Sequence, residues 1–222
     1  MNPDYIIGLD IGQAQDHTAL AVLERPEREP YNRDKPIYSL RHLVRFPLNT
    51  PYTTIVPAVA KLTSAPPLKG SPLVIDHTGV GRALVDMFKQ AKTGCSIIPV
   101  TITAGLAITE PEFRHFHVPK KELVTCLQLL LQARRLLIAR SLPEADTLVE
   151  ELQNFRVKIT PTAHEVFGTW REGDHDDLVL AVVMACWWAE RSPCWGIEGI
   201  RVPKNDDHKC TPPGYPKGVF NS

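Results

Sequence analysis

The sequence predicts an α/β domain, and two patterns carry this prediction. The first is the apolar run Leu73–Asp76, which leads into a Gly-rich turn at 77–81 and then into an amphipathic segment from about Arg82 to Ala91. This order of strand, turn and helix is half of a βαβ unit. The second is the segment 178–189, which is apolar on every helical face and therefore belongs inside a domain. We expect a sheet with at least one helix buried against it.

The other elements are predicted from short apolar runs and the turns between them. The runs Tyr5–Ile11 and Thr18–Leu23, with the turn 13–17 between them, indicate a hairpin. Further strands are expected at 37–46, 96–100 and 136–138, whereas 101–117 is expected to be irregular. Helices are expected at 53–62, 118–135 and 143–152, and a second hairpin at 155–160 and 165–169.

Composition places the chain among ordinary soluble proteins. It has 222 residues, of which 43% are hydrophobic and 23% charged. The 25 basic and 25 acidic side chains cancel, so net charge neither favours nor excludes a nucleic-acid partner. The five cysteines lack CxxC spacing, which favours a reducing cytoplasm, and no segment is typical of a signal peptide or a membrane span. We expect one domain over 1–191 and a Pro/Gly-rich tail over 192–222.

Carboxylates stand at the ends of three predicted elements. Asp10 ends the first strand, Asp76 ends the strand before the Gly-rich turn, and Asp176 and Asp177 precede the buried helix. If the two strands pair in parallel, both deliver their acids to one edge of the sheet, and a helix packed across that sheet brings the third acid there. Crowded carboxylates are costly unless a cation neutralises them. The pattern therefore predicts a site for two Mg²⁺ or Mn²⁺ ions, of the kind that acts in phosphoryl transfer.

The same residues also have plain structural interpretations. Asp10 beside a glycine is typical of a turn, and one of Asp176 and Asp177 is expected to cap the helix. His175 is a candidate for proton transfer or for contact with a phosphate. The turn at 77–81 lacks the GxxxxGK[ST] pattern and the third glycine of a dinucleotide site, so a tight turn is the preferred interpretation.

Basic residues gather around the helix expected at 118–135. This densest basic set consists of Lys120, Lys121, Arg134, Arg135 and Arg140. They are candidates for contacts with DNA phosphates, and a solvated helix face is the alternative interpretation.

Four motifs together resemble the nuclease domain of the tailed-phage terminase large subunit, in the ribonuclease H-like superfamily. They are Gly8–Gly12 with Asp16–Leu20, Leu73–Gly81, Val118–Lys120 and His175–Ala181. Each motif alone is loose, but their order and spacing are more specific, and the resemblance covers about residues 5–191. It implies a mixed five-stranded sheet, three strands antiparallel and two parallel, flanked by helices and followed here by an extended C-terminal tail.

The resemblance also implies an activity: metal-dependent endonuclease cleavage of double-stranded DNA during genome packaging, in the host cytoplasm if the protein is phage-encoded. By motif position, Asp10, Asp76 and one of Asp176 and Asp177 would hold the metals, and Asp16 matches a recurrent acidic position beside them. Terminase large subunits carry an ATPase motor ahead of the nuclease, whereas here the first strand begins a few residues after Met1. Three interpretations stay open: an isolated domain, a motor on another chain, or a stand-alone relative. In the second case a separate packaging ATPase, or a portal or small terminase component, is the expected partner.

Three other classes share some of these features. A sugar-kinase or actin-like ATPase can also begin with Asp-Ile-Gly after a strand, and ATP hydrolysis without DNA would favour it. A Holliday-junction resolvase-type nuclease would share the acids and prefer branched DNA. A silent binding module with the same fold would lack one of the acids, yet all of them are present here.

Overall fold

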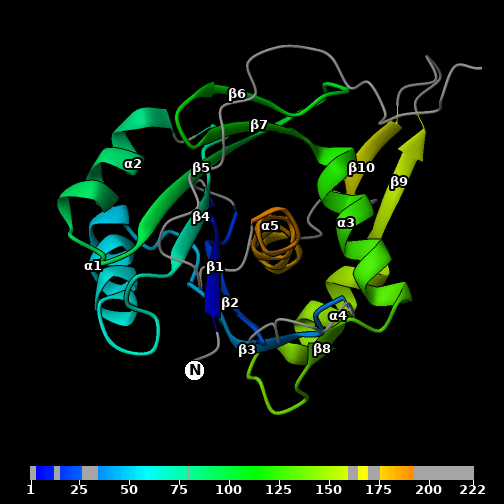
Figure 1. Ribbon diagram of the computed structural model, residues 1–222, viewed down its shortest axis with the longest axis horizontal. Helices are drawn as coiled ribbons and strands as arrows, with labels where there is room; N and C mark the ends of the chain where they lie inside the picture. The colour runs from blue at the N-terminus through cyan, green and yellow to red at the C-terminus, as the bar shows by residue number, and fades with distance from the viewer. Residues whose placement is uncertain are drawn as a thin grey trace, which may run out of the picture.

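The centre of the molecule is an eight-stranded sheet that curves around one helix, α5 (Asp177–Arg191), as Figure 1 shows. The computed structural model describes residues 4–12, 16–26, 35–79, 81–159, 165–169 and 176–192. The strand order is β6-β7-β5-β4-β1-β2-β3-β8. The strands are β1 (Asp4–Asp10), β2 (Ala19–Arg25), β3 (Tyr38–Arg45), β4 (Pro72–Asp76), β5 (Ser96–Thr103), β6 (Thr109–Glu112), β7 (His115–Pro119) and β8 (Leu136–Ile138).

The middle of the sheet has the arrangement expected from the sequence. β1, β2 and β3 are antiparallel neighbours, β4 lies parallel to β1, and β5 lies parallel to β4. The mixed α/β sheet is thus confirmed, but five strands is too low a number. β7 continues the parallel part, β6 adds an edge strand beyond it, and β8 joins β3 at the opposite edge.

The stretch 101–117 is not irregular, and this corrects the expectation from sequence. β5 extends to Thr103, and β6 and β7 follow it. In β7, Phe116 and Val118 are buried on one face, whereas His115 and His117 alternate with them. Histidines in the polar positions of a short strand hid its period of two. The next helix, α3 (Lys120–Gln132), begins only after Pro119, whose ψ of 133° is extended.

Helices cover both faces of the sheet (Figure 1). One face packs against α1 (Tyr52–Thr63) and α2 (Gly81–Gln90). The other packs against α3, α4 (Ala145–Asn154) and α5. A separate two-stranded hairpin, β9 (Phe155–Ile159) and β10 (Glu165–Thr169), confirms the second predicted hairpin. The predicted tail beyond Ser192 lies outside the described residues.

α5 is the most deeply buried element. Every residue from Leu178 to Ala189 is buried except the half-buried Leu180. Full burial of a Leu, Val or Met side chain contributes about 1.5–3 kcal/mol, so packing rather than helix propensity holds this helix in place. No helix in the described part of the chain is long and apolar enough to cross a membrane.

Candidate metal centre

Two of the predicted carboxylates meet where β1 and β4 end. These strands are parallel neighbours with Leu9 opposite Ile75, so Asp10 and Asp76 follow side by side at one edge of the sheet. Both residues are buried, at 6% and 8% exposure, and their carboxyl groups are close enough for each to change the pKa of the other. The Thr78 amide donates to Asp76 Oδ1 at 2.7 Å, which fixes the second carboxylate.

Burial and crowding make both carboxyl groups of this pair harder to ionise. Burial, followed by the charges of Asp76, Asp177 and Asp176, raises the pKa of Asp10 well above its usual range. Burial also raises the pKa of Asp76, but hydrogen bonds from Thr78 favour its charged form and oppose that shift. Without a cation, the pKa values of both carboxyl groups are therefore raised, that of Asp10 the more strongly.

The other two predicted acids each have a basic partner. Asp177 is the first residue of α5, and its Oδ2 accepts a hydrogen bond from Arg45 Nη2 at 2.9 Å. Asp176 lies one residue earlier, with its Oδ2 at 3.3 Å from Lys120 Nζ. The positive charges of Arg45 and Lys120 offset the repulsion that four neighbouring carboxylates would otherwise cause.

The start of α5 is capped differently from the prediction. Asp176 occupies the N-cap position but makes no side-chain capping hydrogen bond, because its carboxylate pairs with Lys120. The acceptor comes instead from α4, where Glu151 Oε2 accepts the amide protons of Leu178 at 3.0 Å and Val179 at 3.1 Å. Burial raises the pKa of Glu151 to about 7, although these amides and Arg45 favour its charged form.

The carboxylates have the chemistry of a site for hard divalent cations, which prefer oxygen ligands. The Asp10–Asp76 pair fits such a cation, because a bound ion would neutralise the crowded charges that raise the pKa of Asp10. Among the described residues, however, no group of three or more His, Cys, Asp or Glu side chains is arranged to hold a metal ion. Asp177 raises the pKa of Asp10 while it is paired with Arg45, so it lies near the pair with its own charge already balanced.

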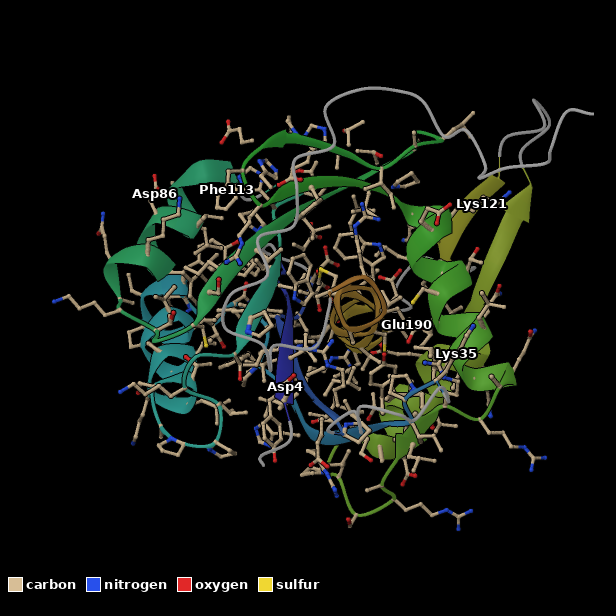
Figure 2. The ribbon with its side chains drawn as sticks, viewed as in Figure 1. Asp4, Lys35, Asp86, Phe113, Lys121 and Glu190 are labelled. Carbon is tan, nitrogen blue, oxygen red and sulfur yellow. The ribbon has the colours of Figure 1, made fainter. Side chains whose placement is uncertain are left out.

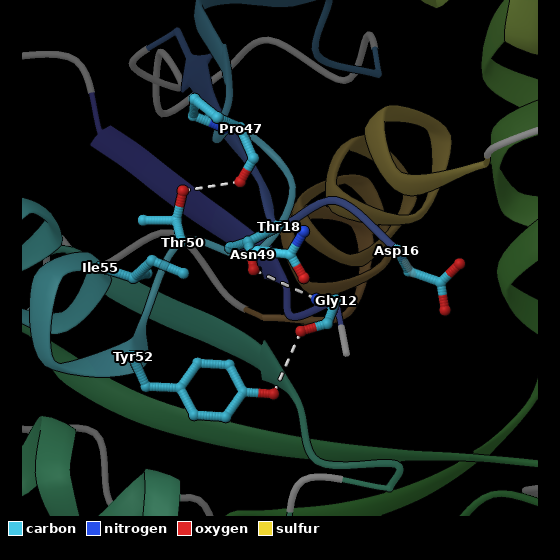
Figure 3. Close-up of a pocket in the computed structure, with 8 residues that line it drawn as sticks. All are labelled: Gly12, Asp16, Thr18, Pro47, Asn49, Thr50, Tyr52 and Ile55. Carbon is cyan, nitrogen blue, oxygen red and sulfur yellow. Dashed lines mark hydrogen bonds between the residues drawn. The ribbon is translucent and has the colours of Figure 1, made fainter. Parts of the chain in front are cut away.

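The remaining predicted acidic and histidine positions contribute less. Asp16 lines a hollow of about 250 Å³ beside the end of β1, together with Gly12, Thr18 and Tyr52 among others. In Figure 3 its carboxylate points away from the Tyr52 hydroxyl, which donates to the Gly12 carbonyl at 3.1 Å. His175 lies outside the described residues.

The structure separates the predicted basic set. Lys120 contacts Asp176 beside the acids, and Lys121 is exposed on the same first turn of α3 (Figure 2). Arg135 instead binds Glu190 with two hydrogen bonds of 2.6 and 3.0 Å. Glu190 lies thirteen residues beyond Asp177 in α5, so at 1.5 Å per residue Arg135 is about 20 Å from the acids. Arg134 is next to it in sequence, and both it and Arg140 are exposed.

Two residues of the centre were missed by sequence reasoning: Arg45 and Glu151. Glu151 stands on the buried face of α4 with Ala145 and Leu148, at a spacing of three residues. An acid in an apolar stripe was a readable signal of a buried polar contact. Arg45 at the end of β3 had no comparable signal, because basic residues commonly end strands at the surface.

Comparison with known proteins identifies solved structures that share this fold. The sequence matches no protein-family model and no curated protein. Among solved structures, the large terminase nuclease of thermophilic phage G20c superposes with a TM-score of 0.60 at 21% identity, over 85% of this chain and 83% of that one. The large terminase (g2p) nuclease domain of bacteriophage SPP1, solved with bound Mn, gives 0.52 at 12% identity over 85% and 87% of the two chains. The large terminase of bacteriophage HK97 gives 0.53 at 13% identity, over 84% of this chain and 40% of that one.

These likenesses define the class of fold. The chain has the ribonuclease H-like fold seen in the nuclease domains of phage large terminases. The resemblance stated from the motifs is therefore confirmed for the fold.

Proposed function

We propose that this protein is a divalent-metal-dependent endonuclease that hydrolyses phosphodiester bonds of double-stranded DNA. The observation that carries the proposal is the buried pair of Asp10 and Asp76 at the neighbouring ends of β1 and β4, with Asp177 close enough to raise the pKa of Asp10. Such a pair is a poor structural element, because two buried carboxyl groups are stabilised only by a proton or a cation. A fold shared with terminase nucleases, one of them solved with Mn, makes a catalytic cation the favoured explanation.

In this proposal the acids hold Mg²⁺ or Mn²⁺, and two ions would act together. Bound ions of this kind lower the pKa of an attacking water and stabilise the leaving oxygen of the phosphodiester. Asp10 and Asp76 supply ligands from the sheet, and Asp177, or Asp176 beside it, supplies one from α5. Asp76 is oriented by the Thr78 amide, so its second oxygen can face a cation. Lys120 is placed to contact a phosphate of the bound strand once Asp176 has another partner.

The biological setting is a further part of the proposal. The similar folds include those of phage large terminases, and they suggest cleavage of a phage genome during packaging in the host cytoplasm. Partner candidates are then a packaging ATPase, a portal or a small terminase component. His175 and Asp16 remain candidates for proton transfer and for indirect support of the ligands.

The test is cleavage of supercoiled plasmid DNA with Mg²⁺, with Mn²⁺ and with EDTA. We expect cleavage only with a metal, and a loss of about 100-fold or more in Asp10→Asn, Asp76→Asn and Asp177→Asn, since even indirect contacts to a metal are worth about 10–100-fold. The matched control is Asp86→Asn, because the Asp86 side chain is half-exposed on α2, where it pairs with Lys89 (Figure 2). Full cleavage by two of the three variants would overturn the assignment of the site.

Two additional substrates separate the competing classes. We expect no acceleration by ATP, because the sequence lacks the GxxxxGK[ST] loop that cradles its phosphates. Micromolar ATP binding by calorimetry would instead support the kinase-like class. A strong preference for a four-way junction over linear DNA would support a resolvase.

A further inference from the structure

Asp177 is held in place by two side chains from distant parts of the chain. Arg45 ends β3 and is 132 residues away in sequence, whereas Glu151 comes from α4. A single nitrogen, Arg45 Nη2, lies 2.9 Å from Asp177 Oδ2 and 3.2 Å from Glu151 Oε1. The guanidinium group therefore links a carboxylate of α5 to a carboxylate of α4.

This link is shielded from water. The exposed fractions of the side chains are 15% for Arg45, 6% for Glu151 and 5% for Asp177. At such burial, solvent and salt screen the charges little, so their attraction depends strongly on geometry. Within the described part of the chain, neither Arg45 Nε nor Glu151 Oε1 has a hydrogen-bond partner, so Nη2 is hydrogen-bonded to Asp177 and attracts Glu151 as an ion pair.

Glu151 also fixes the backbone next to Asp177. Its second oxygen, Oε2, accepts the amides of Leu178 and Val179 in the first turn of α5. These amides have no partner inside the helix, and a negative charge at a helix N-terminus is favourable. One side chain thus holds both the start of α5 and, through Arg45, the carboxylate orientation of its first residue.

We propose that Arg45 and Glu151 form a clamp that positions Asp177 for metal binding, which makes them positioning residues of the centre. The inference rests on the proposed function, because it assigns Asp177 as a ligand. It goes further by naming what orients that ligand. If Arg45 and Glu151 had only a structural role, they would stabilise the fold without affecting metal binding. As a clamp, they also set the affinity of the site for the cation, because they orient Asp177.

The test measures Mn²⁺ affinity by calorimetry on the folded protein without DNA. We expect Glu151→Gln to weaken Mn²⁺ binding about 10–100-fold, because the amide can no longer attract Arg45 while accepting both backbone protons. Glu150→Gln is the matched control: it removes the same charge one residue earlier, at an exposed position, and should change affinity less than about twofold. Arg45→Lys, which keeps the charge but loses the planar group, should also weaken binding.

The Asp177→Asn background separates positioning from a general structural role. If the clamp acts through Asp177, adding Glu151→Gln to Asp177→Asn will weaken Mn²⁺ binding no further. Equal affinities of Glu151→Gln and Glu150→Gln, or a loss that persists in the Asp177→Asn background, would overturn the clamp alone. A wild-type protein without Mn²⁺ affinity would overturn the proposed function and the clamp together. Circular dichroism at the calorimetry temperature verifies that each variant is folded.

Discussion

The contact between β1 and α5 offers a sharp test of how the fold places its acids. Gly8 lies in β1 opposite Ala21 of β2 and Val74 of β4, and it faces α5. A Cβ atom at this position would lie 3.0 Å from the carbonyl carbon of Ala181 and 3.1 Å from the amide nitrogen of Ala185, and closer still to the Ala181 oxygen. All three are backbone atoms, so no side-chain rotation can relieve the contact.

The magnitude follows from these separations. The closest of these contacts, with the Ala181 oxygen, is far shorter than the roughly 3.3 Å of a close C···O contact, so Gly8→Ala must move α5 away from the sheet by more than about 1 Å. Overpacking of this kind costs about 1–3 kcal/mol, which lowers the melting temperature of a chain of this size by roughly 2–12 °C. Because Asp177 begins α5, the shift also reaches the centre, where a displacement of about 1 Å can reduce the rate about 100-fold.

The assay combines thermal unfolding followed by circular dichroism with plasmid cleavage at a temperature where the variant is folded. Gly105→Ala is the control, since its Cβ would meet only Thr103 Oγ1 at 3.4 Å, an ordinary contact. Wild-type melting and cleavage in Gly8→Ala would refute the close approach of α5 to β1. A lower melting temperature with unchanged cleavage would show that the displacement does not reach Asp177.

The remaining expectations concern pH and the basic residues. Folding raises the pKa of Asp10, and it raises the pKa of Glu151 to about 7. The two groups therefore contribute fully to stability below about pH 4, where they are protonated in both states. This contribution is lost as the pH rises through the pKa of each group in the folded protein. The metal-free melting temperature should therefore fall between pH 5 and 8, and fall less in Asp10→Asn; an equal decline in both proteins would exclude Asp10 as a source. Replacing Lys120 or Lys121 by Gln should reduce the slope of log affinity for DNA against log salt by about one per lost contact, whereas Lys89→Gln on α2 should leave it unchanged. If the slope is also unaltered in the Lys120 and Lys121 variants, these two lysines do not contact the DNA.

The part of this architecture that could be predicted from sequence is local. Three features have patterns whose residues lie close together in the sequence. They are the hairpin of β1 and β2, the strand–turn–helix of β4 and α2, and the apolar helix α5. Parallel pairing of β1 with β4 then brings Asp10 and Asp76 together, because parallel strands end at the same edge. β7 was not predicted, because histidines occupy its alternate positions and make the segment look polar. In the fold these histidines are half-buried, and the residues between them are buried.

The contacts that hold Asp177 could not be predicted in the same way, because they join three separate elements. These contacts form only after α4 and α5 have packed on one face of the sheet that contains β3. They then bring together Arg45, Glu151 and Asp177. A capping residue for α5 was expected beside it in sequence, yet the acceptor comes from α4. Sequence patterns report which side chains are buried, whereas the partner of a buried charge is decided by tertiary packing.

This division of charges has a consequence for how a cation would enter. Asp177 and Asp176 already have Arg45 and Lys120, so the Asp10–Asp76 pair is where an incoming divalent ion gains most, by displacing a proton from Asp10. If Asp10 and Asp76 held a cation, Asp177 would be attracted both to that cation and to Arg45. The clamp would then limit how far Asp177 moves, because Glu151 holds the first turn of α5 through two amides. The metal-free arrangement thus keeps the proposed third ligand near the pair while its charge is balanced, which avoids the repulsion that three unpartnered carboxylates would cause.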